Sequence, residues 1–232
     1  MPDFLLTRVA HLLSALLLTI ILSSSASSQS ERKIASGILI DNTGSLRSQF
    51  DQVIKLSKGI VGQTYQRGPI SLFVFKPEGD KSNRLAVVAS DIQWSQDQHV
   101  LDKYLDSVFV VPGQTTLMDG INAIAMQLNA KASLDKAAIA DKVLFLITDG
   151  EDRSSKIREK ELIKTLKESG IKVYAVGLVR ELDNEGGLIR KPARQKAVAF
   201  LEWITKETGG RVVFPKSKNV DVDTLLNELL TK

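Results

Sequence analysis

Five oxygen-bearing side chains stand in three short polar turns, each of which adjoins an apolar stretch of the chain. They are Asp41, Thr43, Ser45, Thr115 and Asp149. Two carboxylates and three hydroxyls offer only hard oxygen donors, which suit Mg²⁺, with Mn²⁺ or Ca²⁺ as the other candidates, rather than zinc or copper. The sequence contains no cysteine, so a thiolate metal site and a cysteine nucleophile are excluded. The pattern predicts a divalent-cation site with some positions left to water or to a ligand.

Each turn, taken alone, also has a purely structural interpretation. Asp41 and Thr43 are residue types that cap helices, and a helix is expected soon after them. The Asp149–Gly150 dipeptide is common in turns, and the next two residues, Glu151 and Asp152, are expected to be solvated rather than ligating. For one loop the two interpretations are equal, whereas three converging loops favour the metal site.

The apolar pattern predicts the elements that must carry these turns. Apolar runs without alternation are typical of central strands covered on both faces, and strands are expected at 33–41, 69–75, 85–89, 143–148, 171–177 and 212–214. Apolar residues at helical spacing are found at 50–62, 98–106, 117–128, 157–169, 197–204 and 225–230. This alternation predicts an α/β fold with a doubly wound, mostly parallel sheet, one antiparallel edge strand and helices on both faces. In such a sheet the turns beyond the carboxyl ends of the strands meet at one edge.

The N-terminal residues have the pattern of a secretory signal peptide. Arg8 precedes an apolar run at 9–22, and small residues follow at 23–28, with a cleavage site expected near Ala26. The expected segments are a signal peptide at 1–26, a linker at 27–32 and one domain at 33–232. The protein would then be secreted or periplasmic, without a membrane span in its mature chain. An uncleaved anchor that extends back to Phe4 is the alternative, and it would bury Arg8.

Composition narrows the function classes further. A chain of 232 residues, 43% hydrophobic and 25% charged, is an ordinary globular chain of one large domain. Its net charge of +4 arises from 31 basic and 27 acidic residues that are interleaved, so no nucleic-acid partner is predicted. The sequence has no Walker loop, dinucleotide fingerprint or HExxH motif, which argues against the common catalytic classes.

The three turns together resemble the metal-ion-dependent adhesion site of von Willebrand factor type A domains. In that family the site reads Asp-x-Ser-x-Ser, then Thr in a Gly-Gly-Thr turn, then Asp in a Thr-Asp-Gly turn. The matching positions are Asp41, Thr43, Ser45, Thr115 and Asp149. The resemblance covers the whole predicted domain and is closest to bacterial secreted proteins described as von Willebrand factor A-related.

Two positions depart from the family pattern. Thr43 replaces the usual Ser and adds a methyl group beside the cation, and Gln114 replaces the second Gly of the middle turn. Thr116 leaves two threonines as candidates for the cation. The register favours Thr115, because the residues that follow then fall on the family's Leu and Asp. That Asp, Asp119, is expected to support its loop.

The resemblance implies a non-catalytic binding domain that engages a protein partner through the bound cation, with the partner supplying a carboxylate. Two other functions remain open from the sequence. The domain could be metal-free and bind its partner through another surface. A phosphatase with an aspartyl nucleophile at Asp41 would need an acid two residues later, where the chain has Thr43.

Overall fold

The computed structural model describes residues 33–81, 83–185, 193–217 and 221–230. The predicted signal peptide and linker lie outside these residues. Among the described helices, none combines the length and the apolar character that a membrane span requires.

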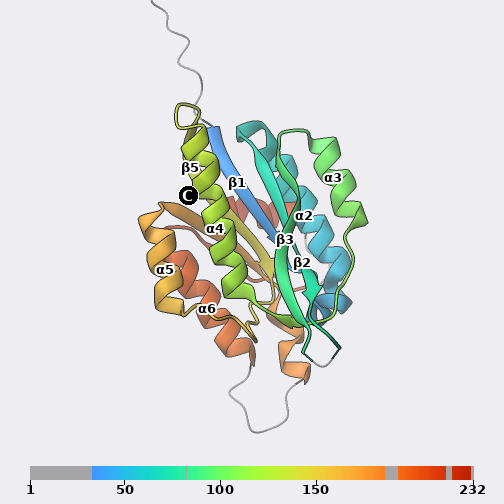
Figure 1. Cartoon of the computed structure of the whole chain (residues 1–232). Coiled ribbons are helices and arrows are strands. Elements are labelled where there is room, and N and C mark those ends of the chain that lie inside the picture. Colours follow the sequence, from blue (N-terminus) through green and yellow to red (C-terminus); the bar gives the residue numbers. More distant parts are fainter. Residues whose placement is uncertain (1–32, 82, 186–192, 218–220, 231–232) are drawn as a thin grey trace, which may run out of the picture. The chain divides into compact units, whose positions relative to one another are not determined.

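A seven-stranded sheet forms the centre of the described part of the chain, in the order β4-β3-β2-β1-β5-β6-β7 (Figure 1). Its strands are β1 (Lys33–Ile40), β2 (Ile70–Glu78), β3 (Leu85–Ser95), β4 (Gln114–Thr115), β5 (Ile139–Thr148), β6 (Ile171–Gly177) and β7 (Val212–Val213). β1 pairs in parallel with β2 and β5, β6 pairs in parallel with β5 and β7, and β3 is antiparallel to β2. The predicted doubly wound, mostly parallel fold is thereby confirmed.

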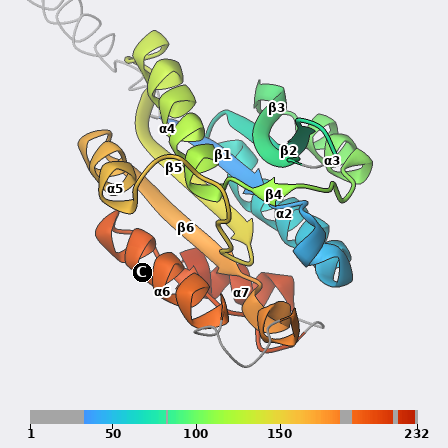
Figure 2. The same ribbon diagram turned by 60° about the horizontal axis from the view of Figure 1, so that its bottom comes forward.

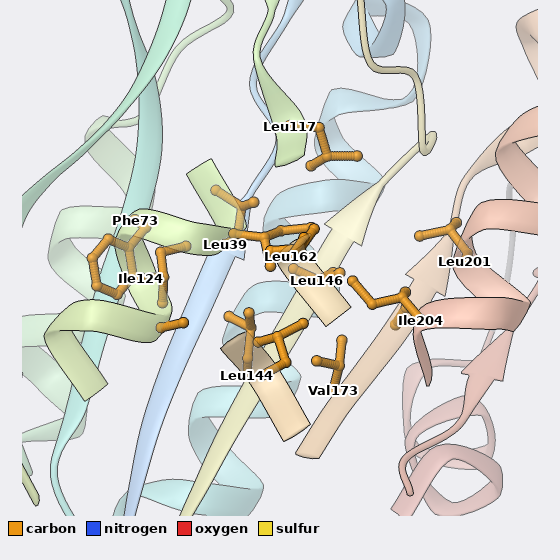
Figure 3. Close-up of a cluster of buried hydrophobic side chains, with 14 of the residues drawn as sticks. Leu39, Phe73, Leu117, Ile124, Leu144, Leu146, Leu162, Val173, Leu201 and Ile204 are labelled. Atoms are coloured by element: carbon orange, nitrogen blue, oxygen red, sulfur yellow. The ribbon is translucent and has the colours of Figure 1, made fainter. Parts of the chain in front are cut away.

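Helices cover both faces of this sheet (Figure 2). The α-helices are α2 (Phe50–Thr64), α3 (Gln98–Ser107), α4 (Leu117–Leu134), α5 (Glu159–Glu168), α6 (Ala193–Glu207) and α7 (Val222–Leu230). Short 3₁₀ helices are η1 (Gly44–Gln49), η2 (Tyr65–Arg67) and η3 (Val179–Glu185). Apolar side chains of α4, α5 and α6 form one buried cluster with the sheet, drawn in Figure 3. Those of α2, α3 and α7 form a second cluster on the opposite face.

β1 lies at the centre because both of its faces are apolar. Leu39 belongs to the first cluster, Ile38 and Ile40 belong to the second, and all three side chains are fully buried. A Cβ atom at Gly37 would lie 2.9 Å from Cγ2 of Ile124. Because Gly37 has no side chain, α4 packs directly on β1. α4 is the helix that follows the middle turn, so this packing helps to position that turn.

Several details of the sheet differ from the prediction. β5 begins at Ile139 instead of residue 143, β2 ends at Glu78 instead of residue 75, and β4 lies outside the antiparallel strand β3. β3 continues to Ser95 instead of ending at residue 89, because its polar second half still pairs with β2, with Ser95 opposite Ile70. The two-residue strand β4 was not predicted, and it pairs in parallel with the first residues of β3, Leu85 and Ala86. β4 thereby ties the middle turn to the sheet.

The carboxyl ends of β1, β2, β5 and β6 lie at one edge of the sheet, at the bottom of Figure 1 and turned forward in Figure 2. Ile40 pairs with Val74 on one side and with Ile147 on the other. The segments that leave β1 and β5 therefore start side by side, and the N–H group of Asp41 donates to the carbonyl of Ile147 at 2.9 Å. This edge brings the first and third turns together.

Candidate metal centre

The first turn is built around the carboxylate of Asp41, which is fully buried. Its Oδ1 accepts hydrogen bonds from the N–H group of Thr43 at 3.0 Å and from the Thr43 hydroxyl at 2.7 Å. Its Oδ2 accepts from the Thr148 hydroxyl at 2.6 Å. The hydroxyls of Thr43 and Ser45 are 3.4 Å apart. Thr43 makes no side-chain cap to η1, so the capping interpretation of this turn does not describe its hydrogen bonds.

Asn42 holds this turn against its neighbours. Its amide nitrogen donates to the carbonyls of Phe75, at 3.2 Å, and Phe109, at 2.8 Å, while its Oδ1 accepts from the Phe75 N–H at 2.8 Å. The Asn42 carbonyl in turn accepts from Val111 at 2.8 Å. Asn42 was not among the predicted site residues, although its place between two candidate ligands at the end of a strand is a signal. Asn42 ties β1, β2 and the segment before the middle turn into one unit.

The middle turn separates the two threonines. Thr115 lines the pocket described below, whereas the Thr116 hydroxyl donates to the carbonyl of Ala86 at 2.9 Å. Gly113 has a φ of 136°, and a Cβ there would lie 2.7 Å from the Leu85 carbonyl carbon. Only glycine fits this approach to β3. Thr115 therefore lies at the pocket, whereas the Thr116 hydroxyl is used within the chain.

The third turn contributes Asp149, whose side chain is also buried. Its Oδ1 accepts from the N–H group of Glu151 at 2.9 Å, while its Oδ2 is buried without a hydrogen-bond partner among the described residues. Gly150 adopts a φ of 78°, a left-handed conformation that glycine reaches without strain. Hydrogen bonding by the Ser45 side chain lowers the pKa of this carboxyl, but no bond to Oδ2 has ordinary hydrogen-bond geometry, so the carboxylate is costly to bury in the metal-free chain.

Three of the five predicted residues line one pocket of about 230 Å³. The lining residues are Thr43, Gly44, Ser45, Gly113, Thr115, Glu151 and Arg153. The other two predicted residues are the buried aspartates that adjoin this lining: Asp41 accepts hydrogen bonds from Thr43, and Asp149 accepts one from Glu151. The structure thus brings the three predicted turns together around one small polar space.

Burial and mutual repulsion shape the electrostatics of the two aspartates. Burial raises the pKa of Asp41, and hydrogen bonds from Thr148 and Thr43 oppose this rise. Burial, and then the charge of Asp41, raise the pKa of Asp149 from 3.8 to about 7, while Ser45 and the Glu151 N–H lower it. Two neighbouring carboxylates that disfavour each other's ionisation form a site that a cation would stabilise.

The donor set fits a divalent cation that takes oxygen ligands. Two carboxylates would balance its charge, and three hydroxyls would add neutral ligands. The described residues contain no group of three or more His, Cys, Asp or Glu side chains that could hold a metal ion. The fit therefore depends on the hydroxyls of Thr43, Ser45 and Thr115 as well as on the unpaired oxygen of Asp149.

The expectation that Glu151 and Asp152 are solvated is wrong for both residues. The Glu151 side chain is 17% exposed and pairs with Arg153, and the Asp152 carboxylate is bound by other parts of the chain. Its Oδ1 accepts from the N–H group of Met118, at 3.2 Å, and from the Ser155 hydroxyl, at 2.5 Å, and Ser155 accepts from the N–H of Asp119 at 3.0 Å. These contacts satisfy first-turn donors of α4, which has no side-chain cap from its own N-cap residue. Asp119 has a structural role, but it holds the segment before α5 and not its own loop, since it accepts from the N–H groups of Lys156 and Ile157.

Comparisons with known proteins agree with this architecture. A family model described as the von Willebrand factor type A domain matches residues 37–220. An aerotolerance-related membrane protein from Bacteroides fragilis, with multiple mutations to serine, is 17% identical with a TM-score of 0.56, over 85% of this chain and 98% of that chain. Manganese-loaded TRAP protein from Plasmodium vivax is 15% identical with a TM-score of 0.45, over 75% and 74%. A sequence comparison with curated proteins finds no match.

At 17% identity the likeness to the Bacteroides fragilis protein shows the fold alone, whereas the family model spans most of the sequence and all three turns. The chain belongs to the von Willebrand factor type A domain family.

Proposed function

We propose that this protein is a secreted or envelope-associated binding domain that engages a protein partner through a divalent cation held by Asp41, Thr43, Ser45, Thr115 and Asp149. Domains of this family mediate protein–protein interactions and commonly bind a divalent cation. The observation that carries the proposal is the pair of buried aspartates beside a hydroxyl-lined pocket, one of them with an unpaired oxygen. Export rests on the signal-peptide pattern of the sequence.

The charges of the site explain how it would select an acidic partner. Asp41 and Asp149 bring two negative charges, and the three hydroxyls bring none, so the protein ligands balance a divalent ion without reversing its charge. Mg²⁺ demands octahedral coordination by oxygen, and a bound ion would supply an electrophilic position for one more oxygen ligand. An Asp or Glu of the partner has the charge and the oxygen chemistry to take that position.

An exposed aromatic side chain beside the site supports a macromolecular partner. Phe109 is 71% exposed, and its carbonyl is held by Asn42 within the same hydrogen-bonded unit as the first turn. Exposed aromatic residues contribute much of the affinity of protein interfaces when a partner covers them. The site thus combines a recognition point for a carboxylate with apolar surface nearby.

The two adjacent threonines provide a matched test of the site. Thr115→Ala is expected to lower the affinity for Mn²⁺ about tenfold or more, because even outer-shell partners of a metal change affinity on that scale. Thr116→Ala is expected to leave the affinity unchanged and to cost about 0.5–1.5 kcal/mol of stability, because it removes the hydrogen bond to Ala86. Isothermal titration of the purified chain with Mn²⁺ and thermal unfolding measure the two effects.

The same variants test the partner. The native envelope fraction is passed over the immobilised protein in Mg²⁺ or in chelator, and a partner that binds only in Mg²⁺ and not to Thr115→Ala supports the cation-mediated mechanism. Equal capture by wild type and Thr115→Ala in chelator would place the interaction on another surface, as the metal-free alternative requires.

Removal of the cation is expected to lower the melting temperature without unfolding the domain. Both buried clusters are apolar and lie between the helices and the sheet, so their stability does not depend on the ion. A free metal concentration a hundred times the dissociation constant stabilises the fold by about 2.7 kcal/mol, which chelation removes. Circular dichroism in chelator should retain the full secondary-structure signal, and its loss would show that the metal is needed for folding.

A further inference from the structure

A third acidic side chain stands at the mouth of the pocket, and an arginine holds it. Glu151 and Arg153 both line the pocket. Oε2 of Glu151 accepts hydrogen bonds from Nε of Arg153 at 3.0 Å and from its terminal nitrogen at 2.6 Å. The side chain of Glu151 is 17% exposed and that of Arg153 is 49% exposed. The carboxylate is therefore the inner member of the pair, and the guanidinium is the outer one.

Backbone hydrogen bonds fix both residues to the candidate ligands. The N–H group of Glu151 donates to Oδ1 of Asp149 at 2.9 Å, and that of Arg153 donates to the Thr115 carbonyl at 2.9 Å. The charge of Glu151 reaches both buried aspartates, since it raises the pKa of Asp41 and of Asp149. Glu151 is thus close enough to influence a bound cation, although its carboxylate is directed to Arg153.

The charge balance shows what would follow if Glu151 became a ligand. Two aspartates leave a divalent ion neutralised, whereas a third carboxylate would make the site negative by one unit and would occupy a coordination position. Both changes oppose an incoming carboxylate, the first by repulsion and the second by competition. A site that is to bind an acidic partner must therefore keep its own third carboxylate away from the ion.

We propose that Arg153 is a positioning residue that holds the Glu151 carboxylate at the rim, outside the coordination shell of the cation, and so keeps the outward-facing position open for a partner's carboxylate. This inference rests on the proposed function, because it assigns roles around the same cation. It also gives Arg153 a second role at the encounter, since its half-exposed guanidinium presents a positive charge beside the position that the partner's carboxylate takes.

The test uses Mn²⁺ alone as the probe, with four variants of the full chain. Arg153→Gln frees Glu151, Glu151→Gln removes the competing carboxylate, and the double variant combines the two changes. Lys156→Gln is the control, because it removes one positive charge, as Arg153→Gln does. Lys156 is exposed in the same loop and does not line the pocket. Mn²⁺ affinity and water-proton relaxation are measured for each, and the latter reports how many exchanging water molecules the ion retains.

Arg153→Gln is expected to raise Mn²⁺ affinity about tenfold, because the number of charged ligands sets the affinity of oxygen sites, and to remove one exchanging water molecule from the ion. The double variant should restore both the affinity and the water count of wild type. Lys156→Gln shows how much a more distant loss of one positive charge contributes, and a purely electrostatic effect predicts a gain in affinity with the water count unchanged. That result would overturn the inference while the cation site stands. Failure of the wild-type chain to bind Mn²⁺ would instead overturn the proposed function and the inference with it.

Discussion

Asp149→Asn is expected to abolish divalent-metal binding and, in the same protein, to raise the melting temperature measured in chelator. The affinity falls by about a hundredfold or more, because the variant removes one of the two charged ligands of the proposed site. The metal-free fold becomes more stable, because the wild type buries a carboxylate that is repelled by Asp41 and has one unpaired oxygen. Asparagine keeps a polar atom in the same place, but it removes the buried negative charge and the repulsion by Asp41.

The expected rise follows from the loss of the buried charge. For a domain of this size, each 1 kcal/mol corresponds to about 2–4 °C in melting temperature. Asp141→Asn is the control. Asp141 lies on β5, the strand that precedes Asp149, but it is exposed, so the variant changes the net charge equally without touching the pocket. Thermal scans in chelator and in Mn²⁺ measure both properties. A lower melting temperature for Asp149→Asn in chelator would contradict the view that the site is unfavourable to the fold without its ion.

Acidification is expected to increase the contribution of Asp149 to the stability of the metal-free protein and to lower the affinity of the site for a metal ion. The pKa of this carboxyl is about 7 in the folded chain against an ordinary value of 3.8. Between these values the folded state binds a proton that the unfolded chain does not bind. The free energy of unfolding contributed by this group therefore increases as the pH falls through 7, and it reaches its full value near the ordinary pKa of 3.8. This contribution is lost as the pH rises through the folded-state pKa. The difference in stability between wild type and Asp149→Asn isolates this contribution.

A metal ion must displace the same proton. Mn²⁺ affinity should therefore increase as the pH rises towards 7, and binding below this pH should release about one proton. Titration calorimetry in two buffers of different ionisation enthalpy measures the number of protons released. An affinity that is independent of pH between about 5 and 7 would mean that Asp149 is already ionised in the free protein, contrary to the cause assigned to its raised pKa.

The strands and turns of this fold could be predicted from the sequence because their signals are local. The apolar runs that become β1 and β5 are continuous, and the turns after them begin with polar residues that cannot continue a buried strand. Parallel register then brings Asp41 and Asp149 to the same edge. The choice of Thr115 over Thr116 came from the family resemblance, and the structure places the Thr115 side chain at the pocket and directs the Thr116 hydroxyl to Ala86.

The contacts that join the turns could not be predicted, because they link residues far apart in the chain. The bond from the Met118 N–H to Asp152 spans 34 positions, and the bond from Thr148 to Asp41 spans 107. Nothing in the local pattern of Asp152 distinguishes a distant helix cap from a solvated acid. The ion pair of Glu151 and Arg153 is local, but its place at the pocket mouth depends on the packing of all three turns.

The Asn42 side chain extends the sheet beyond the point at which the β1 backbone leaves it. Its amide oxygen accepts from the Phe75 N–H while its amide nitrogen donates to the Phe75 carbonyl, which is the reciprocal exchange of a hydrogen-bonded residue pair in an antiparallel ladder, although β1 and β2 themselves are parallel. One side chain thus supplies an additional rung for β2, and the main chain is released to turn towards the pocket. Aspartate matches asparagine in shape but has no donor when ionised, so it could not donate to the Phe75 carbonyl. An amide, and not an acid, is therefore required at this position for the additional pair of hydrogen bonds to β2.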